Sequence, residues 1–178
     1  MYTLLVTVGT TEFDELIKAV DTLEIFHWLI SENITQVTFQ IGKGFYEPCI
    51  LNKLSKDINN NNNNYNIIIN WFRFTPNLSL YIDQSTIIFS HGGAGTIIEC
   101  LERNKLLCIA VNKTLMDDHQ IEMAIAMKSN NLCTILSLPL TKEYLIDLKL
   151  DKMPKSLSQD LDLQLFPSLI DIWTGLIK

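Results

Sequence analysis

The sequence has no run of about 18 apolar residues, the length that a membrane-spanning helix needs, so no span is expected. Basic residues are few: 14 Lys and Arg stand against 20 Asp and Glu, which gives a formal net charge of −6. A chain this acidic is not expected to bind nucleic acid or anionic lipid through its overall charge. The first residues lack a basic segment followed by an apolar stretch, so no secretory signal is expected and a cytoplasmic location is.

Fingerprints of several enzyme classes are also missing. The sequence contains no GxGxxG, GxxxxGK[ST], HExxH or GxSxG pattern, which disfavours a dinucleotide-binding dehydrogenase, a P-loop NTPase, a zinc hydrolase and an α/β-hydrolase. The four cysteines form no CxxC pair and no metal-ligand spacing. They are expected to be free thiols in a reducing compartment, two of them in apolar surroundings. No metal site and no cofactor are expected.

The sequence does contain a regular alternation of short apolar runs and amphipathic segments. Apolar, β-branched runs predict strands, and apolar residues spaced i, i+3, i+4 and i+7 predict helices. The expected strands are 2–8, 34–41, 65–70, 86–89, 106–111 and 132–136. The expected helices are 13–29, 49–58, 78–83, 95–103, 118–128, 141–148 and 161–177. This alternation predicts an α/β fold, a single Rossmann-like domain over residues 1–178 with a doubly wound parallel sheet.

Two segments depart from the alternation. Six consecutive asparagines at 59–64 predict a polar loop inserted between two elements. The C-terminal segment 160–178 is expected to be helical, and it holds more apolar residues than one helix face needs. Two interpretations of that surplus stay open: the helix docks on a partner, or it packs into the core of the domain.

Polar and glycine-rich residues gather at four strand-to-helix junctions. In a doubly wound fold, ligands bind beyond the carboxyl ends of the strands, where such junctions lie. The first junction is Val8-Gly9-Thr10-Thr11-Glu12-Phe13, where the threonine hydroxyls beside free helix N–H groups predict an anion site or an ordinary helix cap. The second is Gln40-Ile41-Gly42-Lys43-Gly44, which is either a plain loop or a contact to a phosphate or a partner.

The third junction is the strongest candidate for a ligand site. It contains Ser90, His91, Gly92, Gly93, Ala94, Gly95, Thr96 and, further into the expected helix, Glu99. Three glycines before a helix let a ligand approach the backbone, and free N–H groups at a helix N-terminus favour a diphosphate. The carboxylate of Glu99 suits the hydroxyls of a ribose. The alternative is a glycine turn that serves only close packing of helix on strand.

The fourth junction runs from Asn112 to the start of the next expected helix, at Asp118, His119 and Gln120. An aspartate suits the positive end of a helix, so an acidic cap would explain Asp118. A cap does not explain the adjacent His119 and Gln120, whose donors and acceptors suit a sugar.

Taken in order, these four motifs resemble the donor-binding subunit of the two-part UDP-N-acetylglucosamine transferase of dolichol-linked oligosaccharide synthesis. The resemblance covers about residues 2–131 and rests on 6–14, 40–44, 90–99 and 115–120. It implies the fold of the C-terminal half of a GT-B glycosyltransferase, similar to bacterial MurG, with UDP-GlcNAc as the bound donor. The implied reaction adds the second GlcNAc, β-1,4 and with inversion, to GlcNAc-diphosphate-dolichol.

The resemblance also implies a partner. A GT-B enzyme has two Rossmann-like domains, and 178 residues supply one. The other half would be a separate, membrane-anchored subunit that holds the lipid-linked acceptor. That subunit would recruit this chain to the cytosolic face of the endoplasmic reticulum.

Roles for single residues follow from the resemblance. The implied substrate-binding residues are Thr10, Thr11, Gly92, Gly93, Ala94, Gly95, Thr96, Glu99, Asp118, His119 and Gln120. Gly93 to Thr96 would hold the diphosphate, Glu99 the ribose, and His119 and Gln120 the GlcNAc, with Asp118 as support. Thr10 and Thr11 would reach the phosphate, and Phe72 and Phe74 follow the strand where similar enzymes hold uracil against backbone. His91 would orient the loop or touch phosphate. The catalytic base stays unassigned: it lies on the partner, or His91 is a candidate.

Two other functions stay open at this point. One alternative is the donor-binding subunit of another lipid-linked polysaccharide transferase that uses a different nucleotide sugar. The other is a non-catalytic module that binds nucleotide sugars, against which the intact glycines and Glu99 argue.

Overall fold

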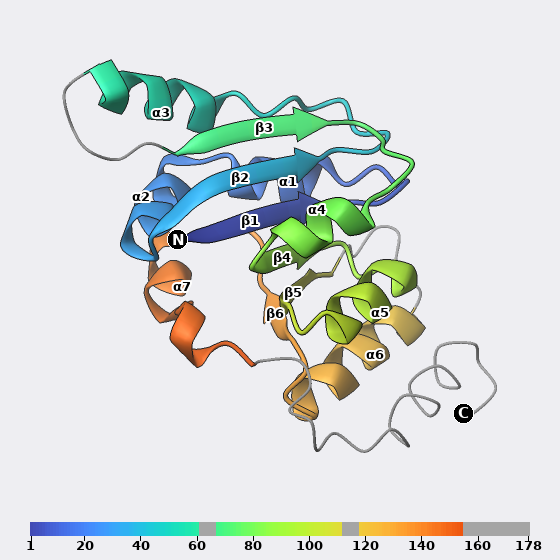
Figure 1. The fold of residues 1–178 in the computed structure, drawn as a ribbon. Coiled ribbons are helices and arrows are strands. Elements are labelled where there is room, and N and C mark those ends of the chain that lie inside the picture. The colour runs from blue at the N-terminus through green and yellow to red at the C-terminus, as the bar shows by residue number, and fades with distance from the viewer. Residues whose placement is uncertain (61–66, 112–117, 155–178) are drawn as a thin grey trace.

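The computed structural model describes residues 1–60, 67–111 and 118–154, and of residues 58–60 and 118–123 it describes the backbone alone. Within these ranges, six strands form one parallel sheet (Figure 1): β1 (Tyr2–Thr7), β2 (Ile34–Gln40), β3 (Ile68–Phe72), β4 (Ile87–Ser90), β5 (Leu106–Ala110) and β6 (Thr134–Leu136). The strand order is β3-β2-β1-β4-β5-β6. This is the order of a doubly wound Rossmann sheet, so the predicted fold class is confirmed.

Helices cover both faces of the sheet. They are α1 (Asp14–Val20), α2 (Leu23–Ser31), α3 (Ile50–Asn60), α4 (Ser79–Gln84), α5 (Ala94–Glu102), α6 (Asp118–Ser129) and α7 (Lys142–Asp147), and a short 3-10 helix, η1 (Leu150–Lys152), follows. Because strand side chains alternate between faces, Leu4 of β1 packs with α1, α2, α3 and α7, whereas Leu5 packs with α4, α5 and α6. Figure 1 shows α1 and α2 behind the sheet and α4 and α5 in front of it. Burial on both faces explains why the strands read as continuous apolar runs.

The predicted single helix over 13–29 is wrong: the segment forms two helices. The chain leaves the helical path at Asp21, whose fully buried carboxylate turns toward the start of α3. There it accepts hydrogen bonds from the backbone N–H groups of Cys49, Ile50 and Leu51, at 2.7, 2.9 and 2.8 Å. Asp21 thus caps a helix that lies far along the chain, and Thr22 caps α2 by accepting from the N–H of Ile25 at 3.2 Å.

The boundaries of β3 and α3 also differ from the prediction. The strand expected at 65–70 is β3 at 68–72, in register with β2 from Gln36↔Ile68 to Gln40↔Phe72. Asn59 and Asn60, expected in a loop, instead continue α3 to its end. The rest of the asparagine run and the expected C-terminal helix at 160–178 lie outside the described residues. None of the helices in the described ranges combines the length and the apolar character that crossing a bilayer requires.

All four cysteines are free thiols, as predicted, although three rather than two are buried: Cys100, Cys108 and Cys133. Burial raises the pKa of Cys100 and of Cys133 to about 12, and it also raises the pKa of Cys108. The buried thiols therefore stay protonated at neutral pH and behave as small apolar side chains.

Candidate functional site

The first and third junctions meet where the strand order reverses, between β1 and β4 at the centre of the sheet. The last residues of these strands, Thr7 and Ser90, are paired in the ladder. The loops that follow them, 9–11 and 91–93, therefore leave the sheet from adjacent positions. In doubly wound folds, this switch point is where ligands bind.

The ring of His91 occupies the space between two of the predicted glycines. A Cβ on Gly9 would lie 2.7 Å from Cε1 of the ring, and a Cβ on Gly93 would lie 2.5 Å from Nε2. Gly9 and Gly92 also adopt left-handed backbone conformations, with φ of +60° and +82°, which other residues rarely take. For Gly9 and Gly93, the packing interpretation of the glycine turn is therefore supported.

His91 is held against the end of β1. Its backbone N–H donates to the carbonyl oxygen of Thr7 at 3.1 Å, and its Nδ1 lies 3.3 Å from the same oxygen. Burial lowers the pKa of His91, and the contact with the Thr7 carbonyl offsets part of this effect. The neutral ring that results favours a proton on Nδ1, directed at that carbonyl, and leaves Nε2 as an acceptor beside the glycine turn.

The N-terminus of α5 opens directly beyond this turn. Gly93 is the N-cap residue and supplies no side chain, so no side-chain hydrogen bond caps the helix. The first N–H groups of Ala94, Gly95 and Thr96 have no intrahelical partner, and together with the helix dipole they favour an anion. Among the described residues, leaving aside its chain neighbours and the backbone of α5, no atom lies within 4 Å of the position that a Cβ on Gly95 would take. Unlike at Gly9 and Gly93, the packing of the described residues therefore does not require a glycine at Gly95.

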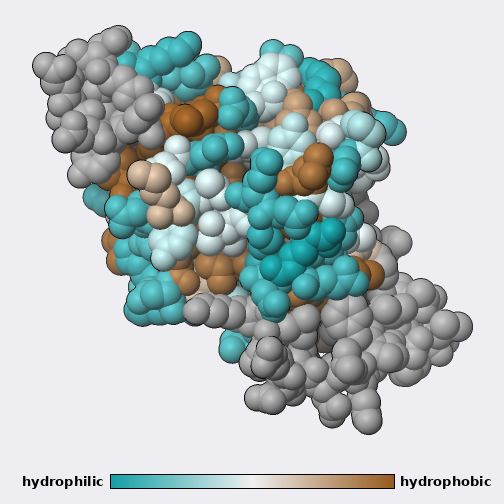
Figure 2. Space-filling model, in the orientation of Figure 1, coloured by the Kyte–Doolittle hydropathy of each residue, from teal (hydrophilic) through white to brown (hydrophobic). Residues whose placement is uncertain are grey.

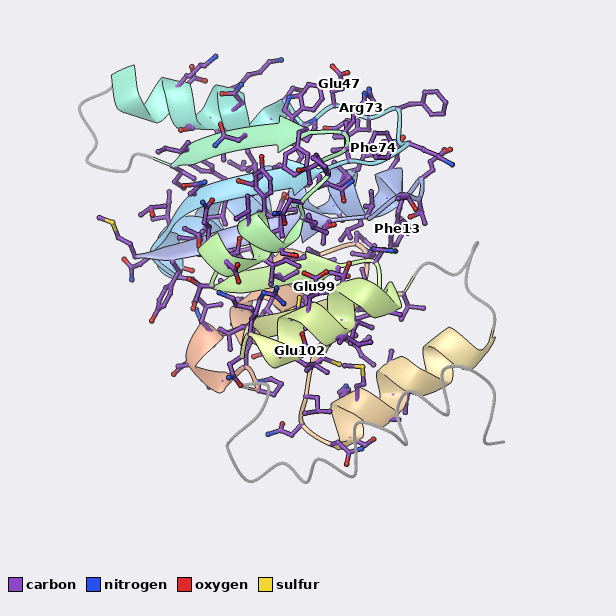
Figure 3. The ribbon with its side chains drawn as sticks, turned by 45° about the vertical axis from the view of Figure 1, so that its right-hand side comes forward. Phe13, Glu47, Arg73, Phe74, Glu99 and Glu102 are labelled. Carbon is purple, nitrogen blue, oxygen red and sulfur yellow. The ribbon has the colours of Figure 1, made fainter. Side chains whose placement is uncertain are left out.

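Glu99 lies on α5 and points toward α4 (Figure 3). Its Oε2 accepts a hydrogen bond from the hydroxyl of Ser79 at 2.6 Å and lies 3.7 Å from Nη1 of Arg103. Its side chain is 34% exposed, so the carboxylate is oriented by its neighbours and still reachable. Figure 2 shows that the surface over α4 and α5 is mostly hydrophilic, as a site for a polar ligand requires.

The two threonines of the first junction differ in their surroundings. Thr10 is exposed. The hydroxyl of Thr11 donates to the carbonyl oxygen of Val8 at 2.7 Å, so Thr11 closes the turn after β1. The N–H of Lys43 donates to the carbonyl oxygen of Thr11 at 3.0 Å, which joins the second junction to the first.

The end of β3 contributes a third loop to this edge of the sheet (Figure 3). The ring of Phe72 packs on that of Tyr81, with 4.4 Å between centroids, and Phe74 is exposed. The guanidinium of Arg73 donates to the carbonyl oxygen of Gly44 at 2.6 Å and pairs with Glu47 at 3.0 Å. The backbone of 72–74 is thereby fixed against the loop after β2.

The fourth junction is only partly described. The backbone of Asp118, His119 and Gln120 forms the first turn of α6, which follows β5, the neighbour of β4. Their side chains and residues 112–117 lie outside the described residues. In the part of the chain that the structure describes, no three His, Cys, Asp or Glu side chains gather as metal ligands would.

The second predicted junction includes Gln40, but sequence reasoning gave this residue no role of its own, and in the structure it connects the loops. Gln40 ends β2 and is 3% exposed. Its Nε2 donates to the carbonyl oxygens of Gly9 and Arg73, both at 2.7 Å, and its Oε1 accepts from the hydroxyl of Thr7 at 2.6 Å. The available signal was a long polar side chain at the last position of a buried strand. Ser79, the partner of Glu99, was also missed, and nothing local marks it.

The family model of the glycosyltransferase family 28 C-terminal domain matches residues 3–161. The chain belongs to this family. Among its relatives, the human UDP-N-acetylglucosamine transferase subunit ALG13 is 31% identical over 146 residues, which are 78% of this chain. The protein of the same name from Yarrowia lipolytica is 27% identical over 157 residues, 83% of this chain. The chain spans 12% of the human protein and 76% of the Yarrowia lipolytica protein.

Solved structures agree on the fold of this family 28 domain. An NMR structure of ALG13 matches with a TM-score of 0.64 and 21% identity, covering 96% of this chain and 94% of the other. The crystal structure of Acinetobacter baumannii MurG matches with a TM-score of 0.55 and 16% identity, covering 97% of this chain and 42% of MurG. The predicted likeness to one half of a GT-B glycosyltransferase is thus confirmed for the fold.

Proposed function

We propose that the chain is the UDP-GlcNAc-binding subunit of an inverting glycosyltransferase that adds the second GlcNAc, β-1,4, to GlcNAc-diphosphate-dolichol. The observation that carries the proposal is the uncapped N-terminus of α5 at the switch point, between the turn at Gly9 and the carboxylate of Glu99. The relatives named as UDP-N-acetylglucosamine transferase subunits support this choice of donor. The proposed location is the cytosolic face of the endoplasmic reticulum.

Each part of the donor has proposed contacts. The N–H groups of residues 94–96 and the hydroxyl of Thr96 bind the diphosphate, and the open space at Gly95 lets it approach the helix. Glu99 accepts hydrogen bonds from the ribose hydroxyls, with Ser79 and Arg103 orienting it. Uracil lies against the backbone of 72–74, and the first turn of α6, residues 118–120, contacts the GlcNAc.

The chemistry that this arrangement supports is stabilisation of a leaving group. When the bond from the sugar to the diphosphate breaks, negative charge develops on the β-phosphate of UDP. Backbone N–H groups already in position stabilise that charge without reorganising, and removing one such donor from an enzyme typically costs about 10²–10³ in rate. The attacking 4-hydroxyl of the acceptor sugar also needs a base. The proposal leaves two sources for that base, the partner and the ring of His91, and it includes no cofactor besides the donor.

A partner subunit is part of the proposal. The match to MurG covers 42% of that chain, as expected if this chain corresponds to one half of a two-domain enzyme. The word "subunit" in the names of the relatives points the same way. The partner would be membrane-anchored and would hold the lipid-linked acceptor.

Titration calorimetry tests the donor assignment. The purified chain is titrated with UDP-GlcNAc, UDP-galactose and NADH, and the titrations are repeated with Glu99→Ala and with Glu102→Ala. Glu102 is the matched control because it lies on the same helix, is more exposed and does not face Ser79 (Figure 3). Binding selective for UDP-GlcNAc that falls at least about tenfold in Glu99→Ala, and not in Glu102→Ala, is expected.

Other outcomes would count against parts of the proposal. Selectivity for a different nucleotide sugar would favour another polysaccharide transferase. Equal losses in both glutamate variants would contradict the assigned role of Glu99. If the chain binds no UDP-sugar, either alone or with the candidate membrane partner, the donor-site assignment fails.

A further inference from the structure

We infer that Gln40 is a positioning residue of the donor site: its buried amide holds the loop after β1 and the loop after β3 at one fixed separation. The inference rests on the proposed function, because that function assigns these loops to the diphosphate and the uracil of one UDP molecule. Gln40 itself touches neither part. It acts through the backbone of Gly9 and of Arg73.

Every hydrogen-bonding group of the Gln40 amide is used. One N–H of Nε2 donates to the carbonyl oxygen of Gly9 and the other to that of Arg73, both at 2.7 Å, while Oε1 accepts from Thr7 at 2.6 Å. A buried network whose members are all satisfied holds a single geometry, because any other arrangement leaves a polar group unpaired. The primary amide is the group that suits this place, since a carboxylate has no N–H to give to two carbonyl oxygens.

The position of Gln40 in the sheet explains why its amide can connect the two loops. The ladder between β1 and β2 ends at Thr7↔Gln40, and the ladder between β2 and β3 ends at Gln40↔Phe72. Beyond these pairs the ladders end and only single backbone hydrogen bonds continue, from the N–H of Gly42 to the carbonyl oxygen of Arg73 at 3.1 Å and from the N–H of Lys43 to that of Thr11 at 3.0 Å. The side chain of Gln40 extends past the end of its own strand and joins the loops on both sides of it.

The hydrogen bonds of the Gln40 amide connect to both halves of the proposed site. On the β1 side, Gly9 packs against the ring of His91, and the backbone N–H of His91 donates to the carbonyl oxygen of Thr7. On the β3 side, the carbonyl oxygen of Arg73 also accepts from the N–H of Gly42 at 3.1 Å. When both loops are already fixed in place, they lose less conformational entropy as a ligand binds between them, so binding is tighter.

The variants are designed to separate positioning from general destabilisation. Gln40→Met keeps the length of the side chain and removes its donors. The matched control is Trp28→Phe, which removes a buried hydrogen bond of 2.7 Å to the carbonyl oxygen of Leu148, between α2 and the segment after α7. Thermal unfolding ranks the stability of both variants, and calorimetry measures their affinity for UDP at a temperature where both are folded.

We expect Gln40→Met to lose at least about tenfold in UDP affinity and Trp28→Phe to keep the affinity of the unsubstituted protein. In ¹H–¹⁵N spectra, the amides of Thr10 and Phe74, which follow the two accepting carbonyls, should shift in Gln40→Met alone. Equal UDP affinity of Gln40→Met and the unsubstituted protein would overturn the inference. So would an equal loss in the control.

A measurement on the unsubstituted protein keeps the inference testable if Gln40→Met does not fold. Both side-chain N–H protons of Gln40 should exchange slowly with water, and their signals should shift when UDP is added. Those of Gln36, whose contact with Thr38 is 3.5 Å long, should exchange fast. Fast exchange at Gln40 would overturn the inference and leave the proposed function standing. Absence of any UDP binding, with the partner present, would instead refute the proposed function and this inference with it.

Discussion

Replacing Gly95 by alanine should stabilise the chain and weaken donor binding at the same time. Gly95 lies in the first turn of α5, and a Cβ there would meet no atom of the described residues within 4 Å outside its chain neighbours and its own helix backbone. Because glycine in a helix costs about 0.5–1 kcal/mol relative to alanine, Gly95→Ala should raise the free energy of unfolding by up to about that amount. For a chain of this length, about 1 kcal/mol corresponds to a rise of about 2–4 °C in Tm.

The same methyl group would occupy space beside the open N–H groups of α5, where the diphosphate is proposed to bind. A hydrogen bond to a charged group contributes about 1.5–3 kcal/mol, so loss of one contact should weaken UDP affinity by about tenfold to a hundredfold. Differential scanning fluorimetry with and without UDP, together with calorimetry, measures both effects. Gly93→Ala is the contrasting variant, because its Cβ would lie 2.5 Å from the His91 ring, so it should lower both stability and affinity.

Two results would refute this reasoning. If Gly95→Ala binds UDP as tightly as the unsubstituted protein, the space at Gly95 does not belong to the diphosphate. If Gly95→Ala lowers Tm, the position is not free of packing, and the contrast with Gly93 does not hold.

Three further predictions concern single side chains. Asp21→Ala removes a buried carboxylate that accepts from the Tyr46 hydroxyl and from the N–H groups of Cys49 and of the first two residues of α3, so urea unfolding should show a loss of about 2–4 kcal/mol, and a loss under 0.5 kcal/mol would contradict the capping role. Because the folded protein lowers the pKa of His91, the unfolded chain binds more protons as the pH falls through about 6.5, and stability falls with it. His91→Gln should therefore lose less stability between pH 7.5 and 5.5 than the unsubstituted protein, and an equal loss in both would contradict this expectation. Ser79→Ala frees one oxygen of Glu99, so UDP affinity should fall severalfold with little change in Tm, and unchanged affinity would remove Ser79 from the site.

The elements of this fold were predictable because their signals are local. The helix expected at 95–103 and the strand expected at 106–111 are α5 and β5 with boundaries that differ by one residue. The break between α1 and α2 was not predictable, because its cause is non-local: the carboxylate of Asp21 pairs with N–H groups that lie 28 to 30 residues further along the chain. Apolar periodicity continues through Asp21, so the pattern alone predicts a single helix.

That the glycine-rich turns of the candidate site meet was also predictable, because the carboxyl ends of parallel strands lie at one edge of a sheet and these turns are visible in the sequence. The sequence by itself therefore determined the fold class and the loops that meet at the switch point. Only the tertiary structure decided which residues of those loops pack against other parts of the chain and which do not. The absence of a Cβ at Gly9 and Gly93 leaves space for the ring of His91, whereas no described atom outside its chain neighbours and its own helix backbone lies close to Gly95. The amide of Gln40 donates hydrogen bonds to carbonyl oxygens 31 and 33 residues away. The physical reason is that the role of each residue depends on contacts between segments distant in sequence, which no local pattern encodes.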